Sequence, residues 1–314
     1  MILVDILLFI LGAALVIFGA DWLVDGASGI ARRFGLSEYV IGATIVGIGT
    51  SMPEFVVSCI AAFQGNADIA IGNVSGSNIF NTLLILGVTA LILPLTFTRS
   101  NFKIDLLMNI GVSLALLIFA LGGTVGRAEG AVMFAGFIAY LIYNFKQGQN
   151  SGDEGKTEEK TAIWKALLLI AAGFGGLIWG GNLFVDHAVN IARYLKVSDA
   201  VIAITIMAGG TSLPELAVCI AAAAKGREQM AIGNIVGSNI SNILLIIGFS
   251  ALVTPLNVAP VNMISVYAVL ASAVLLLFSA LPLKALKLSR GKGAIFIVLY
   301  IAYIMLVLRN GAAA

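Results

Sequence analysis

The sequence predicts an all-α integral membrane protein with ten transmembrane helices, arranged as two inverted five-helix repeats. Three observations predict this fold class: the composition, the spacing of the apolar runs and an internal repeat. Of the 314 residues, 60% are apolar and 11% are charged, whereas soluble domains carry about 25% charged residues. A chain with so few charges belongs in a lipid bilayer, where a spanning helix needs about 20 apolar residues.

Apolar runs of this length follow one another along most of the chain. The first starts at Ile2 without a basic segment or a clear small-residue cleavage site, so we expect a retained span and not a signal peptide. We expect spans at roughly residues 3–23, 38–62, 69–94, 105–123, 129–146, 163–185, 199–224, 229–254, 261–282 and 292–309.

One clearly hydrophilic segment, residues 146–160, has the composition of a flexible, solvated linker. It divides the chain into a first five-helix repeat (1–146), a linker (147–161) and a second five-helix repeat (162–314). The linker is too short to fold as a domain of its own.

The two groups of five spans are copies of each other. With a shift of 161 residues, 17 of the 32 positions in 50–81 are identical to their partners in 211–242. Five is an odd number, so the second copy enters the membrane from the opposite side. Inverted repeats are typical of secondary transporters, whose binding sites lie near the bilayer midplane on broken helices.

The distribution of basic residues predicts the orientation. Fourteen of the 18 lysines and arginines lie in loops on one side of the ten-span arrangement and four on the other. Because basic loops stay in the cytoplasm, we expect a multi-pass protein of the cell membrane with both termini extracytoplasmic and the 146–160 linker cytoplasmic. We expect it to contact the lipid bilayer and not to bind nucleic acid. The sequence leaves the oligomeric state open.

The stretches "GTSMPE" (49–54) and "GTSLPE" (210–215) place a proline and a glutamate inside apolar spans. Pro53 has no N–H, so the carbonyl of Gly49 loses its helical partner and the helix should bend. Pro214 should act in the same way on the second copy. Carbonyls freed inside a bilayer are costly unless something satisfies them, and a cation can do so. We therefore expect bent core helices at spans 2, 3, 7 and 8.

Polar side chains follow the same helices at helical spacing. Ser51 and Glu54 share a face of span 2 with Ser58. Spans 3 and 8 add two stripes with i, i+4, i+8 spacing, namely Asn73, Ser77 and Asn81, and Asn234, Ser238 and Asn242. The pooled ligands are oxygens only, which suits hard cations. Calcium accepts six to eight oxygens in flexible geometry, and sodium could use subsets of the same oxygens. Magnesium fits less well, because it sheds its water reluctantly.

Two glutamates without a basic partner are central to this prediction. No lysine or arginine lies in spans 2, 3, 7 or 8 to pair with Glu54 or Glu215, and an ionised carboxylate at the bilayer centre costs about 2.5–3.5 kcal/mol. Either protons or mobile cations must neutralise the pair, so a protonated structural glutamate remains the alternative. With Cys59, Cys219 and one histidine, His187, a zinc or multi-histidine site is not expected.

The two G-T-S-x-P-E stretches, each followed by a G-N-x-x-G-S-N-I-x-N stretch, resemble the two alpha repeats of the sodium/calcium exchanger family, within the calcium/cation antiporter group. The resemblance implies a prokaryotic type without regulatory domains. It implies calcium ligands at Glu54, Glu215 and the backbone oxygens of Thr50 and Thr211. It implies sodium sites that add Ser51, Ser77, Ser212, Ser238 and carbonyls near Gly47 and Ala208, with Asn81 and Asn242 flanking the centre.

The expected function is secondary active exchange of Na⁺ for Ca²⁺ by alternating access, with no enzymatic activity and no cofactor. The resemblance implies that spans 1 and 6 slide over the core, and Gly12, Gly19, Gly173 and Gly180 would keep that surface smooth. An H⁺/Ca²⁺ antiporter is the nearest alternative, since glutamates also carry protons. A cation channel and an intramembrane hydrolase are further alternatives, although the spans lack a nucleophile–base pair.

Overall fold

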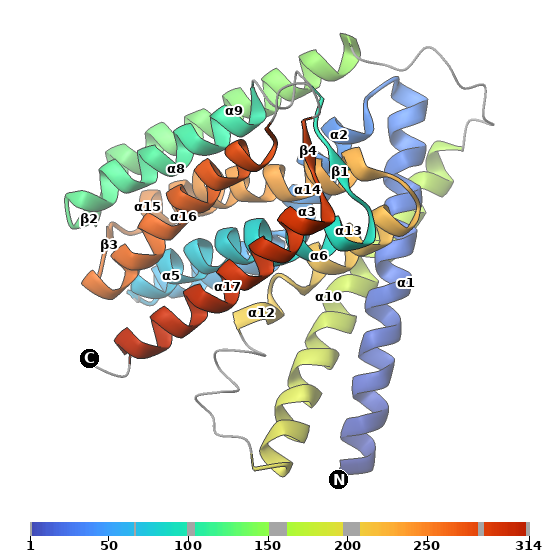
Figure 1. Ribbon diagram of the computed structural model, residues 1–314, viewed down its shortest axis with the longest axis horizontal. Helices are drawn as coiled ribbons and strands as arrows, with labels where there is room; N and C mark the ends of the chain where they lie inside the picture. Colours follow the sequence, from blue (N-terminus) through green and yellow to red (C-terminus); the bar gives the residue numbers. More distant parts are fainter. Residues whose placement is uncertain are drawn as a thin grey trace.

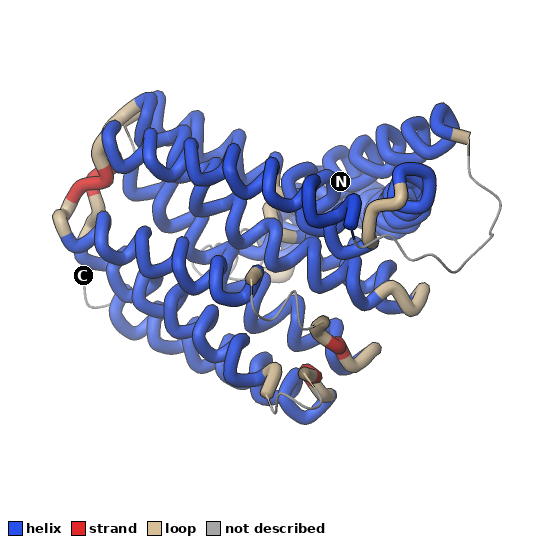
Figure 2. Tube along the Cα trace, turned by 90° about the horizontal axis from the view of Figure 1, so that it is seen from above, coloured by secondary structure: helices blue, strands red, loops and turns tan. Residues whose placement is uncertain are grey.

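The computed structural model describes residues 2–65, 67–98, 104–150, 162–196, 208–281 and 286–311. These residues are almost entirely helical (Figures 1 and 2). Seven of the described helices are long and apolar enough to cross a membrane, or eight if the bent pair Glu38–Thr50 and Met52–Phe63 is one span. Asp105–Leu121 and Leu213–Ala224 are shorter apolar helices. The predicted class of an all-helical membrane protein is confirmed.

The described helices follow the expected runs, with differences at their ends. Those of the first half are α1 (Ile2–Phe34), α2 (Glu38–Ile41), η1 (Gly42–Val46), α3 (Gly47–Thr50), α4 (Met52–Phe63), α5 (Ala67–Ile79), η2 (Phe80–Ile85), α6 (Leu86–Ile92), α8 (Asp105–Leu121) and α9 (Arg127–Asn150). Those of the second half are α10 (Ile163–Tyr194), α12 (Ala208–Gly210), α13 (Leu213–Ala224), α14 (Glu228–Ser241), η4 (Asn242–Ile247), α15 (Gly248–Val253), α16 (Pro260–Ser279) and α17 (Arg290–Gly311).

The first helix runs well beyond the span expected at 3–23. α1 contains no proline and no glycine with a positive φ. The first such glycine, Gly35 with φ +64°, directly follows the helix. The N–H of Leu36 donates to the carbonyl of Ala31 at 2.9 Å, the bond of a glycine-terminated helix end. Similarly, α9 continues to Asn150, over the first residues of the expected linker. The rest of that linker and the start of the 199–224 span lie outside the described residues.

The helices that carry the repeated motif lie at the centre of the molecule. In Glu228–Val253, 83% of the most apolar 18-residue stretch is buried, and in Ile69–Ile92 the share is 72%, against 11% in Arg290–Val307. The helix α14 packs against η1, α2 and α3 of the first half, and α17 of the second half packs against α6 and η2. The two halves are therefore interlocked, with the first half's core helices against the second half's.

Two short antiparallel strand pairs also join the halves. β1 (Leu95–Thr96) pairs with β4 (Lys287–Leu288), and β2 (Thr124–Val125) pairs with β3 (Leu256–Asn257). Each pair connects a turn of the first half to a turn of the second, at the edges of the helical bundle (Figure 1).

The helices α1 and α10 form an antiparallel pair beside the bundle (Figure 1). Near one end His187 Nδ1 lies 2.8 Å from Asp5 Oδ1, and near the other Gly26 faces Ala166. A Cβ added at Gly12 would lie 2.5 Å from the backbone nitrogen of Phe184. This contact leaves no room for a side chain.

The glycines predicted to smooth the surface over the core have a different position. Gly12 lies against Gly180, and Gly19 lies against Gly173, across the α1–α10 contact. That prediction was therefore wrong, because close packing of the two helices on each other takes up their glycine faces. The core contact of α1 is made mainly with α13.

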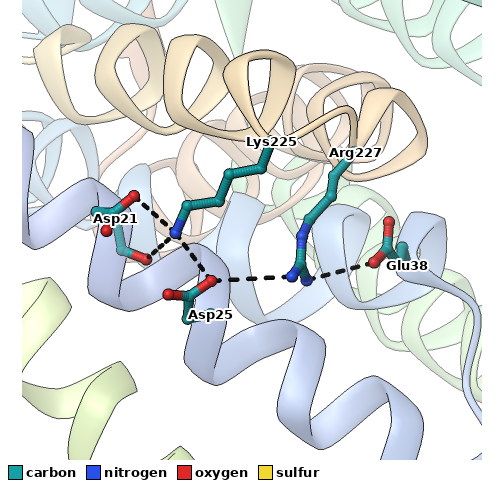
Figure 3. A network of polar contacts seen from close by, with 5 residues as sticks. All are labelled: Asp21, Asp25, Glu38, Lys225 and Arg227. Atoms are coloured by element: carbon teal, nitrogen blue, oxygen red, sulfur yellow. Dashed lines mark hydrogen bonds and ion pairs between the residues drawn. The ribbon is translucent and has the colours of Figure 1, made fainter. Parts of the chain in front are cut away.

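An ion-pair network joins α1 to the core (Figure 3). Lys225 Nζ, just after α13, lies 2.6 Å from Asp21 Oδ1 and 2.8 Å from Asp25 Oδ1. Arg227 contacts Asp25 at 3.8 Å and Glu38, at the start of α2, at 3.4 Å. The turn between α13 and α14 is thus held to α1 and α2.

Candidate cation site

Both proline-containing motifs break their helices in the same way. Ser51, between α3 and α4, has φ −81° and ψ 5°, and Ser212, between α12 and α13, has φ −89° and ψ 8°. Pro53 and Pro214 lie in the first turn of the helix that follows. The first break bends its span by 45°, as expected where a proline removes a helical hydrogen bond.

The two neighbouring core helices contain wide, π-helical turns. Phe80–Ile85 (η2) interrupts the α5–α6 helix, and Asn242–Ile247 (η4) interrupts α14–α15. Such turns are rare and occur frequently at functional sites. They begin at or next to Asn81 and Asn242, two of the predicted site residues.

The two glutamates are bonded by serines of the opposite half. Glu54 and Glu215 are completely buried. Ser212 Oγ donates to Glu54 Oε1 at 2.9 Å, and Ser51 Oγ donates to Glu215 Oε1 at 3.0 Å. Ser77 Oγ also donates to Glu54 Oε1, at 3.3 Å. Each motif thus supplies a serine to the glutamate of the other, so the two motifs form one site.

The remaining predicted residues surround this pair. Thr50 Oγ1 donates to Asn234 Oδ1 of the other repeat at 3.2 Å, and Thr211 lies between α12 and α13, next to Ser212. Ser238 Oγ donates to the carbonyl of Gly47 at 3.0 Å. This carbonyl, which the resemblance implies as a sodium ligand, therefore already accepts a hydrogen bond. Ala208 begins α12, and its side chain is outside the described residues.

Four oxygens at the site have no hydrogen-bond partner. In the described part of the chain, the buried carboxylate and amide oxygens without one are Glu54 Oε2, Glu215 Oε2, Asn81 Oδ1 and Asn242 Oδ1. They form two pairs related by the 161-residue shift. Buried polar atoms are nearly always bonded, so these four oxygens call for a partner such as a cation or a water molecule.

Asn73 and Asn234 brace the glutamate-bearing helices. Asn73 Nδ2 lies 3.3 Å from the carbonyl oxygen of Glu54 and 3.0 Å from Ser58 Oγ. Asn234 Nδ2 lies 3.5 Å from the carbonyl oxygen of Glu215. Each amide thus holds the backbone at a glutamate from the neighbouring helix.

Asn78 and Asn239 belong to the site and were not predicted. They contact Asn242 and Asn81 respectively, at 3.0 Å and 3.2 Å. Both lie in the repeated G-S-N-I stretch and match under the 161-residue shift, which was a usable signal. They were missed because they lie one residue beyond the i, i+4, i+8 stripe.

The donor set suits a hard cation. No cluster of three or more His, Cys, Asp or Glu that could hold a metal occurs among the residues that the structure describes. Two carboxylates must therefore be complemented by hydroxyl, amide and carbonyl oxygens. Such all-oxygen sets are preferred by sodium and calcium and not by zinc or copper.

Comparison with known proteins decides the family. The model of the family described as "Sodium/calcium exchanger protein" matches residues 4–146 and 165–309. The chain belongs to the sodium/calcium exchanger family. The match covers both halves of the chain, including both copies of the motif.

Relatives in the exchanger family span the whole chain. The putative antiporter CaxA of Alkalimonas amylolytica is 37% identical, over 96% of this chain and 98% of its own. The sodium/calcium exchanger MaX1 of Methanosarcina acetivorans is 31% identical, over 97% and 99%. A solved structure of the sodium-calcium exchanger NCX_Mj, soaked with Na⁺ and Sr²⁺, matches with a TM-score of 0.85 and 36% identity, over 97% of this chain and 99% of its own.

Proposed function

We propose that this protein is a secondary active antiporter that exchanges Na⁺ for Ca²⁺ across the cell membrane by alternating access. The observation that carries the proposal is the set of four unbonded oxygens, two carboxylate and two amide, buried at the meeting point of the two repeats. MaX1 is named as a sodium/calcium exchanger, and one NCX_Mj structure was soaked with Na⁺ and Ca²⁺. Both support these ions as substrates here.

The proposed ligands are the residues of the repeated motifs. Calcium would take Glu54, Glu215 and the backbone oxygens of Thr50 and Thr211, with Asn81 and Asn242 beside it. Sodium would use the same glutamates with Ser51, Ser77, Ser212, Ser238 and carbonyls near Gly47 and Ala208. Two carboxylates match the charge of one Ca²⁺.

Competition for shared carboxylates explains why transport would be an exchange. Crossing the membrane with both carboxylates charged and empty is costly. The protein would therefore change its access side when loaded with calcium or with sodium. This cycle needs no enzymatic activity and no cofactor.

We further propose the ten-span layout with two inverted repeats, 1–146 and 162–314, joined by the 147–161 linker. The long helices, the bent pair and the two shorter apolar helices together supply ten candidates for membrane spans. The bias of basic residues supports extracytoplasmic termini and a cytoplasmic linker.

An H⁺/Ca²⁺ antiporter is the second candidate. It is favoured by the complete burial of Glu54 and Glu215 with no lysine or arginine in spans 2, 3, 7 or 8. Such a pair can be neutralised by protons as readily as by sodium.

Uptake of calcium-45 into proteoliposomes tests the proposal. Sodium, potassium and proton gradients are imposed in turn, and we expect uptake only with the sodium gradient. Uptake driven by a pH gradient without sodium would instead support the second candidate. Currents of single-channel size without exchange would contradict both.

The variant Glu54→Gln tests the ligand assignment in the same assay. The substitution removes the negative charge and replaces one carboxylate oxygen with an amide nitrogen, so sodium-driven uptake should be abolished. Glu129→Gln, in the first turn of α9, is the matched control and should transport normally. Full uptake by Glu54→Gln would exclude Glu54 as a ligand.

A further inference from the structure

We propose that Asn78 and Asn239 are positioning residues, which turn the amide oxygens of Asn242 and Asn81 toward the transported cation. This inference rests on the proposed function, because it takes the two amide oxygens as ligands. It concerns two residues that do not contribute unbonded oxygens themselves.

The orientation of Asn78 is fixed by the backbone. Its Nδ2 donates to the backbone carbonyl of Asn239 at 3.0 Å. A carbonyl oxygen can only accept, so the reversed amide would place two oxygens face to face. Asn78 Oδ1 must therefore point the other way, toward Asn242.

The orientation of Asn242 follows from that of Asn78. Asn242 Nδ2 donates to Asn78 Oδ1 at 3.0 Å and to Ser77 Oγ at 3.2 Å. Both of its N–H groups are thus directed at acceptors. The amide oxygen is left on the opposite side, buried and without a partner.

The other half has the same arrangement with a different anchor. Asn81 Nδ2 donates to Asn239 Oδ1 at 3.2 Å, and Asn239 Nδ2 donates to Thr82 Oγ1 at 2.8 Å. The residue that matches Thr82 under the 161-residue shift is Ile243. A threonine hydroxyl can both donate and accept, so it fixes the orientation of Asn239 less strictly than the backbone carbonyl fixes that of Asn78.

Orientation matters because the two ends of an amide have similar shapes and opposite polarity. A reversed Asn242 would direct its N–H groups at the cation and repel it. Without Asn78, the Asn242 amide could rotate at little steric cost. A carboxylate at position 242 has two equivalent oxygens and so no orientation for Asn78 to set, and one of those oxygens would face Asn78 Oδ1.

The test measures equilibrium binding of calcium-45 to the purified full-length protein, with sodium-driven uptake measured in parallel. The variants are Asn78→Leu, Asn242→Asp and their combination. Loss of a partner that orients a ligand typically weakens metal binding by about 10- to 100-fold, and we expect this for Asn78→Leu. In the Asn242→Asp background, the same substitution should cause no loss of calcium affinity.

Asn144→Leu is the matched control. Asn144 is a buried amide on α9 that donates to the carbonyl of Tyr140, and its loss should leave calcium affinity unchanged. If Asn78→Leu does not fold, Asn239→Leu in the Asn81→Asp background gives the same comparison in the other half.

Two results would overturn the inference. One is an Asn78→Leu variant that binds calcium as well as its parent. The other is an equal loss in the wild-type and Asn242→Asp backgrounds, which would mean general damage to the core. Measurements on the wild-type protein separate failure of this inference from failure of the proposed function. Calcium binding without sodium-driven uptake would reject the proposed function alone. Absence of calcium binding would reject both.

Discussion

Ser51 and Ser212 occupy equivalent positions in the two repeats, yet their contacts differ. Ser51 Oγ bonds Glu215, whereas Ser212 Oγ bonds Glu54 and lies 3.1 Å from Ser77 Oγ. Ser77 in turn contacts Asn242. The Ser212 hydroxyl therefore makes more polar contacts than the Ser51 hydroxyl.

Replacing these serines should have unequal effects. A hydrogen bond to a charged group contributes about 1.5–3 kcal/mol, so each alanine variant should bind calcium more weakly. Ser212→Ala should lose more, because its hydroxyl also supports Ser77. Equilibrium calcium-45 binding compares the two variants.

Ser113→Ala is the control for this comparison. Ser113 is buried in α8 and bonds the carbonyl of Asn109 in its own helix. An equal or greater loss in Ser51→Ala than in Ser212→Ala would contradict the stated order.

At the scale of the elements, the α1–α10 contact depends on the absence of side chains. A Cβ at Gly12 would lie 2.5 Å from the Phe184 nitrogen and 2.8 Å from the Gly180 carbonyl oxygen. Backbone atoms cannot yield without separating the helices. Overpacking of this kind costs about 1–3 kcal/mol, so Gly12→Ala should lower the thermal stability of the protein in detergent.

Gly111→Ala provides the comparison for Gly12→Ala. Gly111 lies in α8 with nothing within 4 Å of its added Cβ. Because alanine favours a helix over glycine by about 1 kcal/mol, this variant should be as stable as the parent or more so. Equal melting temperatures for both variants would contradict the close approach of α1 and α10.

The ion-pair network of Figure 3 should affect movement and not ligand binding. Lys225 holds Asp21 and Asp25 of α1, but lies outside the set of ligand oxygens. Partly exposed pairs contribute about 1 kcal/mol or less, a factor of about five in an equilibrium. Lys225→Met should therefore change the rate of sodium-driven calcium uptake by up to about fivefold and leave equilibrium calcium binding unchanged.

Lys165→Met serves as the reference for Lys225→Met. Lys165 is an exposed lysine on α10, and its replacement should alter neither quantity. A loss of calcium binding in Lys225→Met would instead assign the network to the stability of the site.

For the whole molecule, the proposed orientation can be tested with an impermeant maleimide. The native thiols, Cys59 and Cys219, are buried. In a cysteine-free background, Ala314→Cys should be labelled in intact cells, and Ser151→Cys should be labelled only after permeabilisation. The reverse pattern would invert the topology and the direction assigned to each face.

Much of the architecture was accessible from sequence because its causes are local. Apolar runs predicted membrane helices, and prolines predicted the break at Ser51. The helical spacing of Ser51 and Glu54 in span 2, and of Ser77 and Asn81 in span 3, identified side chains of the site, although Ser51 bonds Glu215 and not Glu54. Each of these inferences uses residues within one or two helical turns of each other.

The sequence by itself determined the membrane class, the duplication and the two buried glutamates, since these depend on composition and short-range geometry. Only the tertiary structure decided which groups face each other across the repeats. It paired Ser212 with Glu54 and Ser51 with Glu215, and placed the α1 glycines against α10. It also left the Asn81 and Asn242 amide oxygens without partners. Contacts between residues about 160 positions apart depend on how helices pack, which no local pattern encodes.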